Sequence, residues 1–147
     1  MCGRFQLRPD GEIETLMGKL KVSGMPAAAQ DIAPGASIAI IRAAPERVLD
    51  TALWWLLLDP NTLKPNYKYP SFNSRSDRLS DPRAVAYKPY RESRCIIPAS
   101  AFCEGLGDKK TYHRIALEGR AIAFGGLCRS HISTATGAQI ISASIIT

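Results

Sequence analysis

The chain has 147 residues, of which 46% are hydrophobic, and a formal net charge of +6 at neutral pH. These values indicate one folded domain and exclude a disordered chain. The N-terminus lacks the apolar core of a signal peptide, and the longest strongly apolar run, residues 52–58, is too short to span a bilayer. We therefore expect a cytoplasmic protein that does not act at a membrane.

A helix is the first predicted element. Asp10 can cap it, and apolar residues recur on one face at helical spacing from Ile13 to Leu20. Gly24 and Pro26 then mark its end. The periodicity therefore places one amphipathic helix near the N-terminus.

The rest of the chain is dominated by strand-like runs. Residues 37–42 and 48–58 are predicted strands joined by a turn at 43–46. Residues 59–80, rich in Pro, Asn and Ser, form a predicted loop, and loops of that length are usually functional or disordered. A short helix is predicted to start at Asp81–Pro82. Further strands are expected at 94–104, 111–117, 121–128 and 139–147.

Four cysteines, at positions 2, 95, 103 and 128, form no CxxC pair and no cluster with metal-ligand spacing. Such a pattern supports neither a zinc site nor a disulfide scaffold. We therefore expect a reducing environment, no metal and no cofactor.

Cys2 directly follows the initiator methionine. Removal of that methionine would leave Cys2 with a free α-amine beside its thiol, whose reference pKa values are near ~8 and ~8.5. The amine can condense with an aldehyde to an imine, and the thiol can then close on the same carbon to give a thiazolidine. The alternative is a chance cysteine at a frayed terminus.

Residues 64–94 carry most of the charge, with eight Lys or Arg against three acids and five of the eleven aromatic side chains. Cations interleaved with aromatic rings are typical of single-stranded nucleic acid binding, because phosphates bind the charges and bases stack on the rings. The alternative is a solvated basic face above half-buried tyrosines.

Five sequence blocks, taken together, resemble the SOS response-associated peptidase (SRAP) family in the family's order. The resemblance implies an α+β fold, a mostly antiparallel, barrel-like β-sheet with a few peripheral helices. It also implies a single domain over residues 1–147 that lacks roughly the C-terminal third of a typical family domain. The blocks are "MCGRF" at 1–5, "DIAPGASIAIIR" at 31–42, "FNSRSD" at 72–77, "CIIPASAFCEG" at 95–105 and "AIAFGGLC" at 121–128.

The function implied by this resemblance is that of a sensor of abasic sites in single-stranded DNA. Family members join their N-terminal cysteine to the abasic aldehyde as a thiazolidine, which makes a DNA–protein crosslink. We expect Cys2 to do this after Met1 is removed, in a monomer acting at the bacterial nucleoid. The family name also implies a peptidase or lyase activity.

The resemblance assigns supporting roles to four further residues. Asn73 would orient the α-amine or a sugar hydroxyl, and Glu104 would serve as the general acid and base. Arg75 would clamp a phosphate beside the lesion, and Arg4 would be a second phosphate contact. The alternatives are a loop asparagine in an Asx-turn, an acid at a strand end and ordinary surface cations.

Some features depart from the family. The aromatic residue that usually follows the glutamate is absent, and the family's active-site histidine belongs to a block that does not occur in this chain. His113 and His131 lie in other sequence contexts and are assigned no role. Two other functions therefore stay open: a non-catalytic DNA-binding remnant, and an N-terminal cysteine peptidase or hydrolase.

Overall fold

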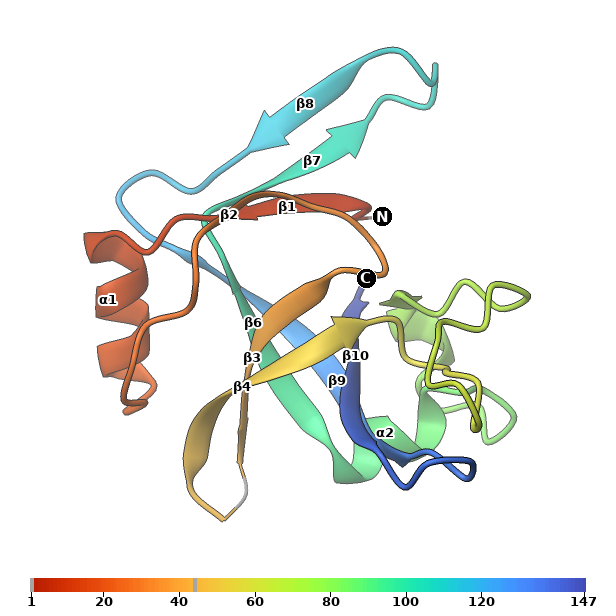
Figure 1. Cartoon of the computed structure of the whole chain (residues 1–147). Coiled ribbons are helices and arrows are strands. Elements are labelled where there is room, and N and C mark those ends of the chain that lie inside the picture. Colours follow the sequence, from red (N-terminus) through yellow and green to blue (C-terminus); the bar gives the residue numbers. More distant parts are fainter. Residues whose placement is uncertain (1, 44) are drawn as a thin grey trace.

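The computed structural model describes residues 2–43 and 45–147, and most of its regular structure is β-strand (Figure 1). Five strands follow one another in hydrogen-bonded order, and the last pairs in parallel with the first, with Ser142 opposite Leu53. The sheet therefore closes into a barrel. In order around the barrel, its strands are β4 (Arg47–Trp54), β3 (Ser37–Ala43), β6 (Arg94–Ala99), β9 (Ile122–Ile132) and β10 (Gln139–Ile146).

A second, four-stranded antiparallel sheet lies across one end of the barrel (Figure 1). Only Ser100 separates β6 from β7 (Ala101–Gly105), which belongs to this second sheet. The predicted strand at 94–104 is therefore two strands in two sheets. This element order confirms the expected mostly antiparallel, barrel-like α+β fold. The strands of the second sheet are, in order, β2 (Ala29–Ile32), β1 (Arg4–Leu7), β7 (Ala101–Gly105) and β8 (Tyr112–Ile115).

The first helix, α1 (Gly11–Lys19), is confirmed with its cap, since the Asp10 carboxylate accepts hydrogen bonds from two backbone amides of the first turn. It ends earlier than Gly24, because the chain turns at Lys21, whose φ is 54°. The second helix, α2 (Tyr87–Glu92), begins later than predicted. The Asp81 carboxylate instead accepts from the Arg83 amide at 3.0 Å and stabilises a turn.

The predicted strand at 48–58 is too long. The structure ends β4 at Trp54, and the Trp55 amide donates back to the Leu53 carbonyl at 2.8 Å, which bends the chain out of the barrel. The hairpin between β3 and β4 is as predicted, although residue 44 of its turn lies outside the described residues. The long loop that follows contains the two-residue strand β5 (Asn73–Ser74), paired in parallel with β10, and a short 3-10 helix at Ser76–Arg78.

Aromatic rings join the barrel to the second sheet. Phe5 on β1 is buried and packs edge-on against Trp54 at 5.1 Å between ring centroids and against Phe124 at 6.1 Å. Phe102 on β7 packs against the same Phe124 at 5.6 Å. The N-terminal strand is therefore anchored to the barrel by the rings of Trp54 and Phe124, which fixes the position of the residues just before it. Within the described chain, no helix is long and apolar enough to cross a membrane.

Gly126, on β9, has no room for a side chain. A Cβ atom there would lie 2.8 Å from Ile97 Cδ1 and 2.9 Å from Cys95 Sγ, both buried. We expect Gly126→Ala to lower the free energy of unfolding by about 1–3 kcal/mol, the usual cost of overpacking a core. Gly125→Ala is the matched control, because its Cβ would meet only Ile146 Cδ1 at 3.8 Å. Urea unfolding of both variants measures the difference, and equal stabilities would contradict this account of the packing.

Candidate N-terminal cysteine site

Cys2 lies just before β1 and is buried, with 5% of its surface exposed. The register of β1 against β7 sets its surroundings, since Arg4 faces Cys103 and Phe5 faces Phe102. The Cys2 thiol donates a hydrogen bond to the Arg4 carbonyl at 3.6 Å. The side chain is thus held against the main chain of its own strand, and Cys2 belongs to the packed core rather than to a frayed end.

Asn73 is the residue that the loop brings to Cys2. Its Nδ2 donates a hydrogen bond of 2.7 Å to the Cys2 carbonyl. Its Oδ1 is buried and makes no hydrogen bond with the described residues. Asn73 therefore holds the main chain of Cys2 with one end of its amide and keeps an acceptor in the site with the other.

Glu104, on β7, lies two residues from Phe102, so the two side chains share a face of the sheet. Phe102 packs toward the barrel, and this places the Glu104 side chain on the same side. Burial raises the pKa of the Cys2 thiol to about 11, and the negative charge of Glu104 adds to that rise. The structure thus brings Cys2, Asn73 and Glu104 to one place.

The two predicted phosphate-binding arginines are each paired with an aspartate. Arg4 contacts both carboxylate oxygens of Asp31 at 2.6 Å, and Arg75 donates to both oxygens of Asp77 at 3.0 and 2.6 Å. All four side chains are more than half exposed. Since exposed pairs of this kind contribute little to stability, both guanidinium groups can exchange partners at little cost.

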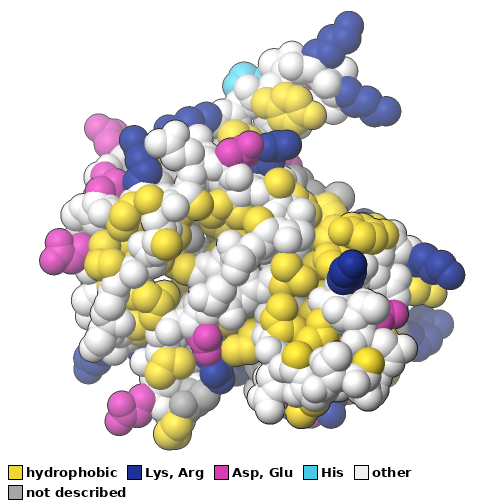
Figure 2. Space-filling model, viewed as in Figure 1, with side chains coloured by type: hydrophobic (Ala, Val, Ile, Leu, Met, Phe, Trp, Pro, Cys, Tyr) yellow, Lys and Arg dark blue, Asp and Glu magenta, His cyan; other side chains and the backbone are white. Residues whose placement is uncertain are grey.

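Two aromatic residues of the basic segment, Tyr67 and Phe72, are joined through Trp55, and Phe72 directly precedes Asn73. Tyr67 is 75% exposed and packs edge-on against Trp55 at 5.3 Å, and Trp55 contacts Phe72 at 5.4 Å. Figure 2 shows hydrophobic side chains gathered on the surface of the loop region that follows β4, with Lys and Arg side chains at its edge. The segment is not one continuous surface, because Arg91 and Arg94 line a different hollow near α2.

A hollow of about 500 Å³ opens on the outer face of the second sheet, beside the chain that carries Cys2. Gly3 and Arg4 line one side of it, and Cys103, Gly105 and Tyr112 line the other. The hollow is open to solvent beside Gly3, the residue that follows the buried Cys2.

Sequence reasoning missed two neighbours of the site. Cys103 lies directly opposite Arg4, and His113 lies directly opposite Glu104 on β8. Only the strand register reveals these pairs, because nothing in the sequence fixes how β8 aligns with β7. His131 has a structural role instead, since its Nε2 shares a hydrogen bond of 2.8 Å with Ser142 Oγ on the neighbouring strand.

Among residues 2–43 and 45–147, no three His, Cys, Asp or Glu side chains converge in a way that would hold a metal ion. All four cysteines are free thiols, three of them buried. The chemical groups of the site are therefore a thiol, a carboxylate and an amide.

At one end of the β-barrel, a buried cysteine at position 2 thus accepts a hydrogen bond from an asparagine and lies near a carboxylate. The family model for SOS response associated peptidase (SRAP) matches residues 1–147. The chain belongs to the SRAP family. No curated protein sequence matches it.

Solved structures share its fold. A protein from Bordetella bronchiseptica aligns with a TM-score of 0.70 at 24% identity, over 99% of this chain and 71% of its own. A protein from Bacteroides thetaiotaomicron aligns with a TM-score of 0.75 at 15% identity, over 99% of this chain and 67% of its own. A phage-related protein from Bordetella bronchiseptica aligns with a TM-score of 0.68 at 15% identity, over 99% of this chain and 68% of its own. At these identities the likeness shows the fold alone.

Proposed function

We propose that this SRAP-family chain is a sensor of abasic sites, which binds single-stranded DNA and joins Cys2 to the abasic sugar as a thiazolidine. The observation that carries this proposal is the hydrogen bond from Asn73 to the Cys2 carbonyl, which holds the cysteine beside the Glu104 carboxylate. Met1 lies outside the described residues, and its removal, which frees the α-amine, is part of the proposal.

The reaction begins at the amine. The Cys2 α-amine attacks the C1′ aldehyde of the ring-opened sugar, a C–N bond forms, and the carbonyl oxygen leaves as water to give an imine. The sulfur of Cys2 then attacks the imine carbon, a C–S bond forms, and the thiol proton ends on the imine nitrogen. The net change is the loss of one water molecule, and no oxidant or cofactor is consumed.

The pKa of the Cys2 thiol assigns Glu104 its task. A thiol whose pKa is raised to about 11 is almost wholly protonated at neutral pH, so ring closure needs a base to take its proton. The Glu104 carboxylate serves as that base and returns the proton to the imine nitrogen. The Asn73 Oδ1 is a free acceptor for the α-amine or for a sugar hydroxyl during the same steps.

The loop beside Asn73 supplies a path for the DNA strand. The exposed ring of Tyr67 offers a face on which a base can stack. Arg75 follows Asn73 by two residues and can exchange Asp77 for a phosphate. Binding is therefore expected to depend on salt, because each phosphate contact releases counterions.

Cys2→Ser tests the proposed function. The hydroxyl cannot close the ring, so we expect no adduct with abasic single-stranded DNA that survives heating in denaturant, while salt-sensitive binding remains. Gel shifts with and without denaturant measure the two properties, and intact mass of the wild-type adduct should equal Met1-free protein plus DNA less one water. A heat-stable adduct of the Cys2→Ser variant would overturn the assignment of Cys2.

Asp77→Asn tests the role of Arg75. The change releases Arg75 from its ion pair, so we expect tighter binding of single-stranded DNA, whereas Arg75→Ala should weaken it and reduce the slope of log K against log salt by about 0.7. Glu118→Gln is the matched control, because it removes one negative charge without freeing any arginine of the described chain. Equal effects of Asp77→Asn and Glu118→Gln would place Arg75 away from the bound strand.

A further inference from the structure

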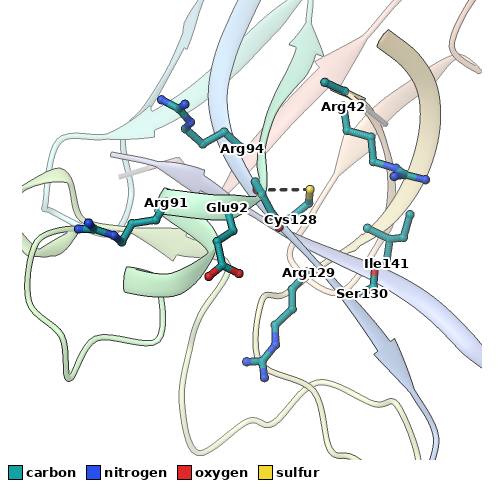
Figure 3. A pocket seen from close by; sticks show the side chains of 10 residues that line it. Arg42, Arg91, Glu92, Arg94, Cys128, Arg129, Ser130 and Ile141 are labelled. Carbon is teal, nitrogen blue, oxygen red and sulfur yellow. Dashed lines mark hydrogen bonds between the residues drawn. The ribbon is translucent and has the colours of Figure 1, made fainter. Parts of the chain in front are cut away.

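A second cysteine lines a hollow at the end of the barrel where α2 lies, away from the N-terminus (Figures 1 and 3). The hollow has a volume of about 320 Å³. The Cys128 thiol faces the junction of α2 and β6, where it donates to the Ser93 carbonyl at 3.4 Å. Four arginines, one each from β3, α2, β6 and β9, line the hollow: Arg42, Arg91, Arg94 and Arg129.

The hollow has more positive than negative charge in its lining, since four arginines and one carboxylate, Glu92, line it. Arg42 is held by Asp50 at 2.8 Å, and Arg91 lies over the ring of Tyr87. Arg94 and Arg129 make no ion pair with the described residues. Of these arginines, Arg42 is the one whose positive charge lowers the pKa of Cys128, and the negative charge of Asp50 opposes it.

Cys95 lies beside Cys128 on the adjacent strand. In the pairing of β6 with β9, Cys95 is opposite Gly126, so Cys128 is the next residue on the same face of β9. Gly126 presents no side chain, and Cys95 Sγ occupies the space that its Cβ would fill, at 2.9 Å. The glycine thus lets the sulfur of Cys95 lie over β9, on the face from which the Cys128 side chain also projects.

The two thiols are not equivalent. The interaction with the Cys95 thiol and the positive charge of Arg42 lower the pKa of Cys128, against burial and the negative charge of Asp50. The same interaction and burial raise the pKa of Cys95. Cys128 therefore ionises first, on the side that faces the hollow, and Cys95 stays protonated behind it.

We propose that Cys128 and Cys95 form a peroxide-sensitive dithiol, in which Cys128 is oxidised first and Cys95 resolves it to a disulfide between β6 and β9. The hollow admits a small hydroperoxide, and the arginines orient its polar oxygens. The N-terminal cysteine reaction does not use either residue, so this modification site is independent of the proposed function.

The oxidation balances as follows. The Cys128 thiolate attacks one oxygen of hydrogen peroxide, the O–O bond breaks, and the departing hydroxide takes a proton to become water. Cys128 is then a sulfenic acid. The sulfur of Cys95 attacks it, the S–O bond breaks, and the leaving hydroxide takes the Cys95 proton as a second water. Two thiols are oxidised and one peroxide is reduced, and an added dithiol reverses the change.

The test is peptide mapping without reductant, after hydrogen peroxide is added in slight excess to the folded, fully reduced protein. We expect one dominant linked pair of peptides, containing Cys95 and Cys128, that is lost on treatment with dithiothreitol. In Cys95→Ser the link should disappear and a 1,3-dione should capture the sulfenic acid on Cys128. In Cys128→Ser, Cys95 should stay reduced.

Cys103→Ser is the matched control, because Cys103 belongs to the second sheet and its loss should leave the link unchanged. Thermal melting shows whether each variant is folded, and the wild-type result does not depend on any variant. The proposal is overturned if folded wild-type protein forms no Cys95–Cys128 link, or if the link forms only after denaturant is added. Since the assay contains no DNA, its outcome is separate from that of the crosslinking test.

Discussion

The hydrogen bond from the Asn73 amide to the Cys2 carbonyl ties the start of the chain to a residue 71 positions away. Asn73 can make it because β5 lies on β10, where the Thr147 and Ile145 amides donate to the carbonyls of Ser74 and Phe72 at 3.0 Å each. β10 in turn closes the barrel against β4. The geometry of the N-terminal site therefore depends on barrel closure, although none of its reactive groups lies on a barrel strand.

Burial holds Cys2 in a fixed position but lowers the reactivity of its thiol. The packed position of Cys2 raises the pKa of its thiol to about 11, so the sulfur is a poor nucleophile on its own at neutral pH. In the proposed reaction, an amine that attacks first and a carboxylate that takes the thiol proton would together remove this limit. The raised pKa also makes Cys2 less reactive toward other thiol reagents. Cys128, in the arginine-lined hollow at the far end of the barrel, is the more readily ionised thiol.

Local patterns in the sequence predicted many of the helices and strands. The Asp10 cap and the apolar periodicity gave α1, and alternating apolar runs gave the barrel strands. Local patterns could not predict which distant strands pair with one another. The two-residue strand β5 has no periodicity of its own and forms only because it pairs with β10. Likewise, β4 ends at Trp54 because tertiary contacts, not strand propensity, bend the chain there. The position of Cys2 behind Met1 indicated its chemistry, and family resemblance predicted Asn73 and Glu104, whereas the Asp31 and Asp77 partners of the arginines needed the structure.

The central claim is that Asn73 positions Cys2 for attack, and the crosslinking rate of Asn73→Ala tests it most directly. Misplacing reacting groups by about 1 Å costs up to about 10²-fold, so we expect slowing of about 10- to 100-fold on abasic single-stranded DNA, with little change in DNA affinity or melting temperature. Asn61→Ala is the matched control, since Asn61 lies in the same loop but bonds Thr134. A rate for folded Asn73→Ala equal to that of the wild type and of Asn61→Ala would contradict the account.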